Sequence, residues 1–186
     1  MGDQALSRFL EYDWDICLDI GSGHGLHSKA MREAGRSTIM VDLGHEADIQ
    51  SDYLSMHTIA PVDAIWCSHT LEHQVDPGAF LRRMYQDLAD GGILAVTVPP
   101  LKHEIVGGHV TLWNAGLLLY QLIMAGFDCS QARVGTYGYN ISVIVERQGF
   151  DMPELKHDCG DIETLAPYFP LPVWQGFDGR VGDIDW

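Results

Sequence analysis

Basic residues are scarce in this chain of 186 residues, which has 11 lysines and arginines against 26 aspartates and glutamates. The formal net charge at neutral pH is therefore −15. Protein affinity for nucleic acid comes largely from lysine and arginine replacing the counterions of phosphate groups. Because Arg82 and Arg83 form the one basic pair in the sequence, the composition argues against a nucleic-acid partner.

The chain also lacks clustered cysteines and long apolar runs. Its four cysteines stand far apart, at positions 17, 67, 129 and 159, so they match neither a disulfide framework nor a zinc knuckle. No apolar run has the length needed to span a bilayer, and the first residues have neither the basic start nor the apolar core of a signal peptide. We therefore expect a cytoplasmic protein with no membrane partner.

The chain does contain enough apolar sequence for a sizeable core, since 46% of its residues are hydrophobic and 20% are charged. Strand and helix signals alternate along it, which is typical of a parallel sheet. The predicted strands are 16–20, 37–41, one near Ile49, 64–67, 93–98, 127–134 and 140–146, of which the last two form an antiparallel hairpin. The predicted helices are a short one over 5–10, then 26–34, one from Pro77 to the Gly91-Gly92 pair, and 114–125.

The stretch 17–25 is the most informative part of the sequence, because Asp19 precedes three closely spaced glycines at 21, 23 and 25. Such glycines can adopt positive φ and let the backbone approach a ligand, while the following helix presents unpaired N–H groups. The third glycine falls one residue too early for a dinucleotide fingerprint. A carboxylate here would repel a pyrophosphate but attract the ammonium group of a methionine moiety. The pattern therefore favours S-adenosylmethionine over NAD, and an NAD oxidoreductase is the weaker alternative.

Two further acidic residues follow predicted strands. Asp42 ends the strand 37–41, where a carboxylate can accept both ribose hydroxyls of a nucleoside. Asp52 follows the short strand near Ile49 and could accept a hydrogen bond from the adenine amino group. For each residue the alternative is a purely structural role as a cap or turn, and for Asp52 the two interpretations are almost equally favoured.

Four segments in this order resemble class I S-adenosylmethionine-dependent methyltransferases, in the broad group that serves quinone and natural-product biosynthesis. They are 18–25, 63–73, 88–99 and 109–127, within a region of resemblance from about 16 to 147. The resemblance implies an α/β, Rossmann-like, mostly parallel seven-stranded sheet with helices on both faces and a C-terminal antiparallel hairpin. It also implies methyl transfer from S-adenosyl-L-methionine to the oxygen, nitrogen or carbon of a small molecule. The alternative function is a non-catalytic methyltransferase-like subunit that binds a cofactor or a partner.

The same resemblance assigns residues to parts of the cofactor. It implies that Asp19, Gly21 and Gly23 contact the methionyl part, that Asp42 and Asp52 contact ribose and adenine, and that residues 68–71 line the pocket. The full set of predicted cofactor-binding residues is Asp19, Gly21, Ser22, Gly23, Gly25, Asp42, Leu43, Asp52, Tyr53, Ser68, His69 and Leu71.

Methyl transfer from a sulfonium requires alignment of the acceptor and exclusion of water, and a base is optional. If the acceptor is a hydroxyl, a neutral histidine can take its proton. We assign this role to His73 and His109, while His69 and His103 are further candidates. His24 and His27 stand beside the glycine turn, where contact with solvent or cofactor is expected instead.

The run 69–73 reads His-Thr-Leu-Glu-His and matches the inverted zinc-protease signature. It directly follows a predicted buried strand and precedes a new helix start at Asp76-Pro77, which argues against a protease helix. Quinone-pathway relatives have a similar Glu-x-x-Glu-His segment there, proposed to hold a divalent ion, and His69 replaces the first Glu. His69, Glu72 and His73 could bind a metal, but we favour a role for Glu72 and His73 in orienting the loop by hydrogen bonds. No metal is therefore predicted.

The sequence divides into a cofactor-binding domain, 1–148, and an irregular, proline-rich and aromatic extension, 149–186. This extension either covers apolar surface of the same domain or forms a lid or dimer contact. Too few residues separate the predicted strands at 37–41, near Ile49 and at 64–67 for full crossover helices. We expect turns in these crossovers and a homodimer in which a second chain covers the exposed sheet.

Overall fold

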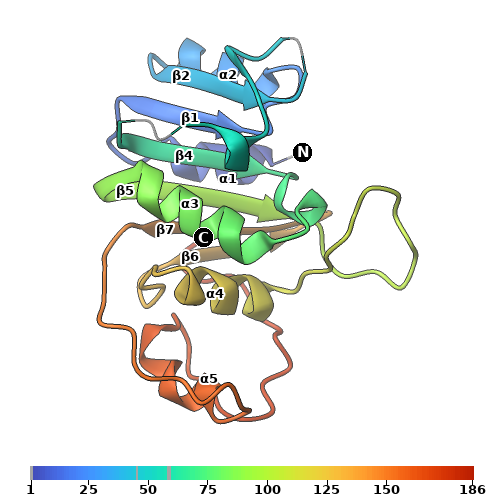
Figure 1. The fold of residues 1–186 in the computed structure, drawn as a ribbon, viewed down its shortest axis with the longest axis vertical. Coiled ribbons are helices and arrows are strands. Elements are labelled where there is room, and N and C mark those ends of the chain that lie inside the picture. Colours follow the sequence, from blue (N-terminus) through green and yellow to red (C-terminus); the bar gives the residue numbers. More distant parts are fainter. Residues whose placement is uncertain (1, 45, 58–59) are drawn as a thin grey trace.

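The apolar segments of the sequence form one sheet of seven strands in the computed structural model, which describes residues 2–44, 46–57 and 60–186. The spatial order is β3-β2-β1-β4-β5-β7-β6 (Figure 1). The strands β1 to β5 run parallel, whereas β7 is antiparallel to both β5 and β6. The strand bounds are β1 (Ile16–Ile20), β2 (Ser37–Asp42), β3 (Ile49–Gln50), β4 (Val62–Ser68), β5 (Leu88–Val98), β6 (Arg133–Tyr137) and β7 (Asn140–Glu146). This confirms the predicted Rossmann-like class with its C-terminal hairpin.

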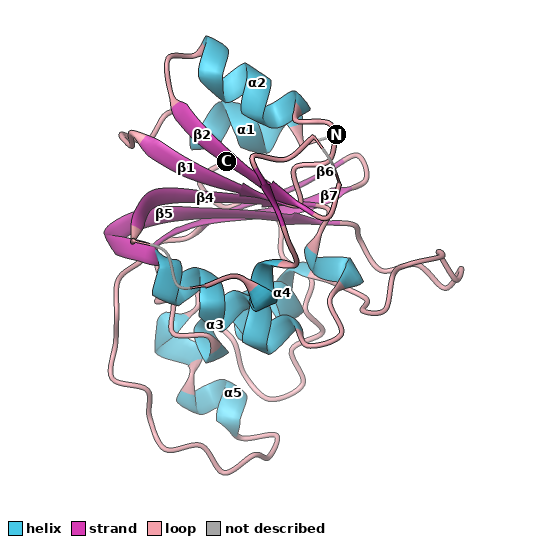
Figure 2. Ribbon diagram, turned by 45° about the horizontal axis from the view of Figure 1, so that its top comes forward, coloured by secondary structure: helices cyan, strands magenta, loops and turns pink. Residues whose placement is uncertain are grey.

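Helices cover both faces of the sheet (Figure 2). The helices α1 (Asp3–Phe9) and α2 (Leu26–Glu33) lie on one face, and α3 (Pro77–Asp87) and α4 (Ala115–Met124) lie on the other. Successive side chains of a strand point to opposite faces. In β4, Ala64 and Trp66 accordingly join the cluster under α1, while Ile65 and Cys67 join the cluster under α3 and α4. The central strands are apolar on both faces because both faces are covered.

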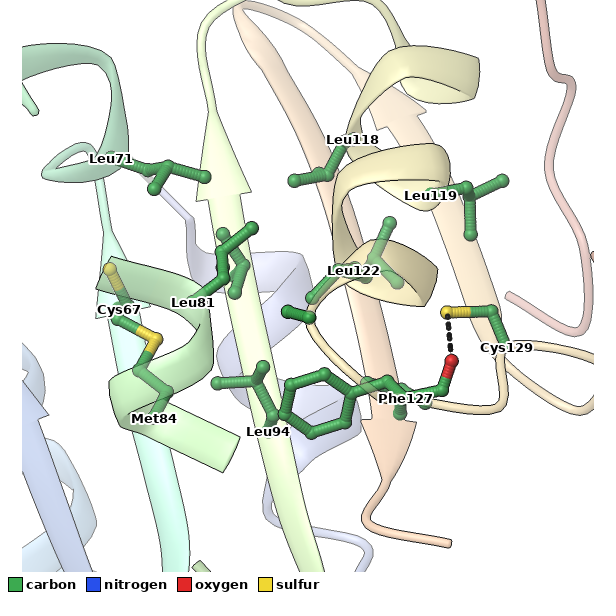
Figure 3. Packing of buried hydrophobic residues seen from close by; sticks show 14 of the residues in the cluster. Cys67, Leu71, Leu81, Met84, Leu94, Leu118, Leu119, Leu122, Phe127 and Cys129 are labelled. Atoms are coloured by element: carbon green, nitrogen blue, oxygen red, sulfur yellow. Dashed lines mark hydrogen bonds between the residues drawn. The ribbon is translucent and has the colours of Figure 1, made fainter. Parts of the chain in front are cut away.

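The larger core lies between the sheet and the pair α3 and α4 (Figure 3). Side chains of Leu81 and Met84 from α3 and of Leu122 from α4 are fully buried there, together with Leu94 of β5. Both helices start at side-chain caps, since Asp76 Oδ1 accepts from Ala79 N at 2.8 Å and Asn114 Oδ1 accepts from Leu117 N at 2.7 Å. These caps fix where each helix begins relative to the strand before it.

In two places the predicted boundaries differ from the structure by more than two residues. The helix from Pro77 ends at Asp87, before the Gly91-Gly92 pair, and β5 already begins at Leu88. A bulge at these glycines separates two stretches of pairing between β4 and β5, so that Leu88 still pairs with Val62. The first strand of the hairpin is β6, which begins at Arg133, whereas 127–134 was predicted. Its turn falls at Gly138, whose φ of 53° suits glycine, so the strand must end at Tyr137.

The crossovers on either side of β3 contain no α-helix among the described residues, as the sequence predicted. The single turn η1 (Tyr53–Ser55) lies between β3 and β4. Among the described residues, no helix combines the length and apolar character needed to cross a membrane.

The extension 149–186 runs around α4 and returns to the edge strand β6 (Figure 1). It contains the short helix α5 (Asp161–Thr164). Gly116 N of α4 donates to Gly179 O at 2.9 Å, and Val134 and Ile184 form an antiparallel bridge. The ring of Trp186 stacks on Tyr137 with a centroid distance of 5.6 Å. The extension therefore packs on the same domain, whereas its role as a lid or dimer contact and the division at 148 stay predictions.

Candidate functional site

Two adjacent clefts open where β1, β2 and β4 end, at the point where the strand order reverses between β1 and β4. Ligands of open α/β sheets bind at such a point. The larger cleft, here called the acidic cleft, has a volume of about 270 Å³ and includes the predicted residues Gly21, Asp42, Leu43, Asp52, Tyr53 and His69. The smaller one, the histidine cleft, has a volume of about 220 Å³ and includes Gly21, Ser22, His24, His27, Ser68 and His69. Of the predicted cofactor residues, neither cleft is lined by Asp19, Gly23, Gly25 or Leu71.

The glycine turn forms the boundary between the clefts. Gly21, Gly23 and Gly25 have φ angles of 73°, 52° and 69°, which side-chain-bearing residues rarely adopt. Gly21 N donates to Val41 O at 2.8 Å and so ties the turn to the end of β2. Gly25 directly precedes α2, so the first N–H groups of that helix lie next to the turn.

Asp42 holds the glycine turn and faces the acidic cleft at the same time. Its Oδ2 accepts from Gly23 N at 2.9 Å, and its Oδ1 accepts from Gly44 N at 2.8 Å. Because each carboxylate oxygen can accept a second hydrogen bond, these contacts orient the group without preventing ligand binding. Asp52 likewise caps η1, accepting from Leu54 N at 3.2 Å, and lines the same cleft. The structural and ligand-binding roles of both residues are thus compatible.

Asp19 lies behind the turn, with an exposed fraction of 2%. Ser28 Oγ of α2 donates to its Oδ2 at 2.6 Å. Burial raises the pKa of Asp19, and the hydrogen bond from Ser28 partly offsets this effect. The contact of Asp19 with the ammonium group of a cofactor stays a prediction.

His69 stands between the two clefts with a φ of 55°, which is uncommon for a residue with a side chain. Its Nε2 lies 2.8 Å from Asn140 Oδ1, and Asn140 Nδ2 donates to Tyr137 O, which fixes the orientation of that amide. Its Nδ1 lies 3.3 Å from Glu72 Oε1. Both ring nitrogens therefore face acceptors, and the hydrogen bond to Glu72 raises the pKa of His69. The geometry favours the charged imidazolium form.

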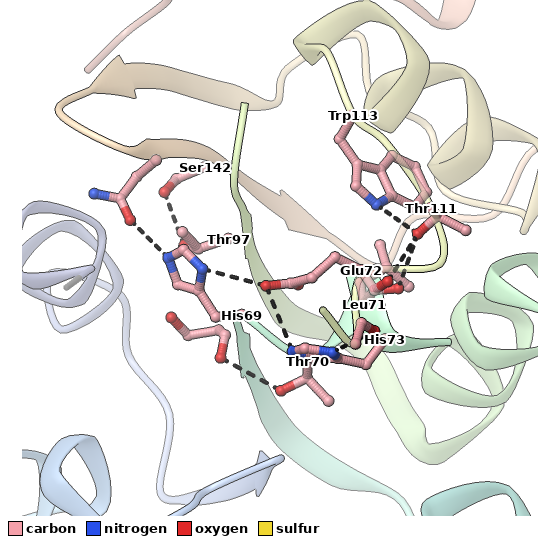
Figure 4. Close-up of polar contacts among 12 residues, drawn as sticks. His69, Thr70, Leu71, Glu72, His73, Thr97, Thr111, Trp113 and Ser142 are labelled. Carbon is pink, nitrogen blue, oxygen red and sulfur yellow. Dashed lines mark hydrogen bonds and ion pairs between the residues drawn. The ribbon is translucent and has the colours of Figure 1, made fainter. Parts of the chain in front are cut away.

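The predicted bases His73 and His109 lie side by side, with ring centroids 5.1 Å apart. His73 Nδ1 lies 2.8 Å from Gly108 O (Figure 4). Because a carbonyl only accepts, Nδ1 must carry the proton, and in the neutral ring Nε2 has a free lone pair. His73 lines the acidic cleft, and His109 lies on the loop between β5 and α4. The geometry thus leaves His73 Nε2 able to accept a proton or bind an ion.

Several contacts in the site were not predicted from the sequence. Phe80 of α3 lines the acidic cleft and packs edge-on against Tyr53 at a centroid distance of 5.2 Å. Trp66 Nε1 donates to His27 Nδ1 at 3.1 Å, which fixes the tautomer of a histidine in the other cleft. Periodicity assigns Phe80 and Trp66 to the core, and no local signal in the sequence shows that Phe80 also borders a cleft or that Trp66 contacts a histidine that does.

Comparison with protein families gives a match over residues 4–131 to a family described as a methyltransferase domain. Among curated proteins, the chain is 36% identical over 98 residues to the ubiquinone biosynthesis O-methyltransferase of Xylella fastidiosa, covering 43% of this chain and 40% of that protein. It is 33% identical over 95 residues to the corresponding enzyme of Xanthomonas oryzae, covering 41% of this chain and 40% of that protein. The chain therefore spans less than half the length of these relatives.

Solved structures that share the fold include two methyltransferases. A methyltransferase dependent on S-adenosylmethionine from Archaeoglobus fulgidus superimposes with a TM-score of 0.66 at 16% identity, covering 77% of this chain and 91% of that one. The second is the 1,6-didemethyltoxoflavin-N1-methyltransferase of Burkholderia thailandensis, solved with bound 1,6-didemethyltoxoflavin and S-adenosylhomocysteine. It superimposes with a TM-score of 0.66 at 17% identity, covering 80% of this chain and 77% of that one.

Proposed function

Because the chain belongs to the methyltransferase-domain family, we propose that it transfers the methyl group of S-adenosylmethionine to a small-molecule acceptor. The observation that carries this proposal is the acidic cleft, in which Asp42 and Asp52 face the same space beside the glycine turn. The two carboxylates suit the hydroxyl and amino groups of a nucleoside. The S-adenosylhomocysteine bound in the Burkholderia methyltransferase, which has the same fold, supports the choice of cofactor.

The two clefts suit the two ends of such a cofactor. The nucleoside occupies the acidic cleft, with its ribose hydroxyls on Asp42 and its adenine near Asp52 and Tyr53. The amino-acid tail extends past Gly21 into the histidine cleft, beside Ser22 and Ser68. When bound, the cofactor would supply an electrophilic methyl group, whose carbon the nucleophile of the acceptor would attack as the bond from carbon to sulfur breaks. The sulfur leaves with the bonding electron pair as neutral S-adenosylhomocysteine.

The acceptor approaches from the loop between β5 and α4. This loop exposes four apolar side chains and carries His109, so it suits an apolar or aromatic molecule with one nucleophilic group. The exposed apolar residues are Leu101, Ile105, Val110 and Leu112. The names of the curated relatives favour an oxygen acceptor. For a hydroxyl acceptor, His73 Nε2 takes the proton released on transfer, with His109 as the second candidate.

Calorimetric titration with S-adenosylhomocysteine tests the cofactor, and a titration with NADH under the same conditions is the control. We expect one cofactor per chain and no binding of NADH. Turnover is then measured as S-adenosylhomocysteine formed from S-adenosylmethionine with a panel of phenols, catechols and amines. Absence of S-adenosylhomocysteine binding would reject the proposed function, and binding without turnover across the panel would favour the non-catalytic subunit.

Two further parts of the proposal concern the partners of the chain. We propose a homodimer, because the crossovers beside β3 lack helices among the described residues. No nucleic acid is proposed as a partner, given the formal charge of −15. Light scattering at several protein concentrations measures the mass, and a monomer at every concentration would reject the dimer.

A further inference from the structure

The last part of the extension, residues 183–186, lies along the edge strand β6. Val134 N donates to Ile184 O at 2.9 Å, and Ile184 N donates to Val134 O at 2.8 Å. Thr136 N donates to Asp183 Oδ1 at 2.9 Å. An edge strand otherwise presents such backbone groups unpaired. Residues 183–186, here called the edge clamp, therefore complete the hydrogen bonding of β6 at these two positions.

The strand β6 also contacts α1, on the face of the sheet that this helix covers. Tyr137 belongs to the cluster under α1, and its hydroxyl accepts from Ala5 N at 3.0 Å. Ala5 lies in the first turn of α1, where backbone N–H groups have no partner within the helix, and the N-cap residue Gly2 has no side chain to bond them. Arg133 Nη1 donates to Glu11 Oε2 at 2.7 Å. The strand thus contacts α1 at its start and just past its end.

The edge clamp fixes the ring that bonds α1. The indole of Trp186 stacks on the ring of Tyr137 at an interplanar angle of 24°, and its Nε1 lies 3.5 Å from Gln4 Oε1 of α1. Gly135 lies two residues before Tyr137 and so faces the same side of the sheet. A Cβ atom added to Gly135 would overlap the indole. The glycine therefore leaves the space that Trp186 needs to reach both Tyr137 and α1.

The helix α1 in turn contacts two residues of the histidine cleft. Gly2 is so close to this cleft that an added Cβ would lie 3.2 Å from Ser68 Oγ and 3.5 Å from His27 Cε1. At the other end of the helix, Phe9 packs on Trp66 at a centroid distance of 5.4 Å, and Trp66 Nε1 donates to His27 Nδ1 at 3.1 Å. Ser68 and His27 both line the cleft. A displacement of α1 would therefore change the shape of the cleft.

We propose that Trp186 is a positioning residue for the cofactor, because it holds α1 through Tyr137 and thereby fixes Ser68 and His27 in the histidine cleft. This inference rests on the proposed function, which places the amino-acid tail of the cofactor in that cleft. Packed side chains and rigid elements of this kind carry coupling between distant positions. The role differs from that of a lid, since Trp186 lines neither of the two clefts.

The test compares two ligands that share the nucleoside and its sulfur. S-adenosylhomocysteine has the amino-acid tail, whereas 5′-methylthioadenosine has a methyl group in its place. Calorimetry on the full chain measures both affinities. We expect Trp186→Ala to weaken binding of S-adenosylhomocysteine by about 3- to 30-fold, in the range known for residues that act on a site without contacting its ligand. The affinity for 5′-methylthioadenosine should stay unchanged, because the acidic cleft does not depend on α1.

Three further variants separate positioning from a general loss of stability. Gly135→Ala should act like Trp186→Ala, because its Cβ displaces the indole while Trp186 itself is retained. Trp186→Phe keeps an aromatic ring on Tyr137 and should restore the affinity for S-adenosylhomocysteine. Trp174→Ala changes a 61% exposed tryptophan of the same extension. It is the matched control and should bind both ligands like the unchanged protein.

Amide hydrogen exchange of α1, measured without any ligand, tests the chain of contacts separately. Trp186→Ala should speed exchange across residues 5–9, and Trp174→Ala should not. Unchanged exchange in Trp186→Ala, or an equal loss of affinity for both ligands, would overturn the inference. If the unchanged protein binds neither ligand, the proposed function fails, and the exchange of α1 still decides whether Trp186 holds the helix.

Discussion

Gly21 and Thr70 are in such close contact that a Cβ atom added to Gly21 would lie 1.9 Å from Thr70 Oγ1. Thr70 cannot easily give way, because its hydroxyl lies 3.3 Å from both Ile20 O and Ser68 O, between the ends of β1 and β4. Gly21 also has a φ of 73°. The position thus excludes a side chain on two separate grounds, and the contact fixes the wall shared by the two clefts.

Gly21→Ala should therefore lower both the free energy of unfolding and the affinity for S-adenosylhomocysteine. Positive φ alone costs an alanine about 1–2 kcal/mol, and the clash with Thr70 adds to it. Gly35→Ala is the matched control, since Gly35 has a φ of 83° but no atom within 4 Å of the added Cβ. Urea unfolding and calorimetry measure the two effects. Equal loss of stability in both variants, with cofactor affinity retained, would show that the contact with Thr70 has no such role.

Asp42→Asn should weaken binding of S-adenosylhomocysteine by about 10- to 100-fold, because a hydrogen bond to a charged group contributes about 1.5–3 kcal/mol. The amide also cannot accept with both atoms, so it loses one of the bonds from Gly23 N and Gly44 N. Asp90→Asn, with the side chain 96% exposed and paired with Arg147, is the control and should leave the affinity unchanged. If Asp42→Asn bound S-adenosylhomocysteine as tightly as the unchanged protein does, Asp42 would not be the residue that binds the ribose hydroxyls.

Local features of the sequence predicted the fold well. The cap at Asp76-Pro77, the glycine turn and the alternation of strands and helices each depend on neighbouring residues, and all are present in the structure. The bounds predicted for the first hairpin strand, 127–134, were wrong because the turn at Gly138 sets where β6 ends, and a β-rich stretch alone does not reveal where the turn falls.

The candidate site was less predictable because its geometry depends on contacts between distant segments. The spacing 69–72–73 suggests that three side chains converge, and Glu72 Oε1 does lie 3.3 Å from His69 Nδ1 and 4.0 Å from His73 Nε2. The other ring nitrogen of His69, however, faces Asn140 of β7. The place near Glu72 and His73 is filled by His109, which a separate loop supplies. The spacing of residues within one segment indicates neither the contact between His69 and Asn140 nor the approach of His109 to Glu72 and His73.

Asp19→Asn should stabilise the protein at neutral pH. Burial raises the pKa of Asp19 in the folded state, so the folded protein holds this proton more tightly than the unfolded chain does. The stability that Asp19 contributes is present below its unfolded pKa, near 3.9, and is lost as pH rises through the higher folded value. The increase in the free energy of unfolding caused by Asp19→Asn should therefore be largest at pH values above both the unfolded and the folded pKa, and it should shrink in acid. Thermal unfolding from pH 3.5 to 8 measures it, and a gain independent of pH would contradict the assignment.

Asp87→Ala should be among the most destabilising single changes in the chain. Asp87 Oδ2 accepts from Tyr53 OH and from Arg83 Nε, each at 2.8 Å, and the carboxylate is 1% exposed. Its loss leaves the largely buried guanidinium of Arg83 without its ion-pair partner, at a cost of about 3–5 kcal/mol. Affinity for S-adenosylhomocysteine should fall as well, because Tyr53 lines the acidic cleft. Glu11→Ala, which breaks exposed ion pairs with Arg8 and Arg133, should cost far less, because solvent screens such pairs. Urea unfolding compares the two variants, and similar losses in both would show that the buried pair contributes no more than the exposed ones.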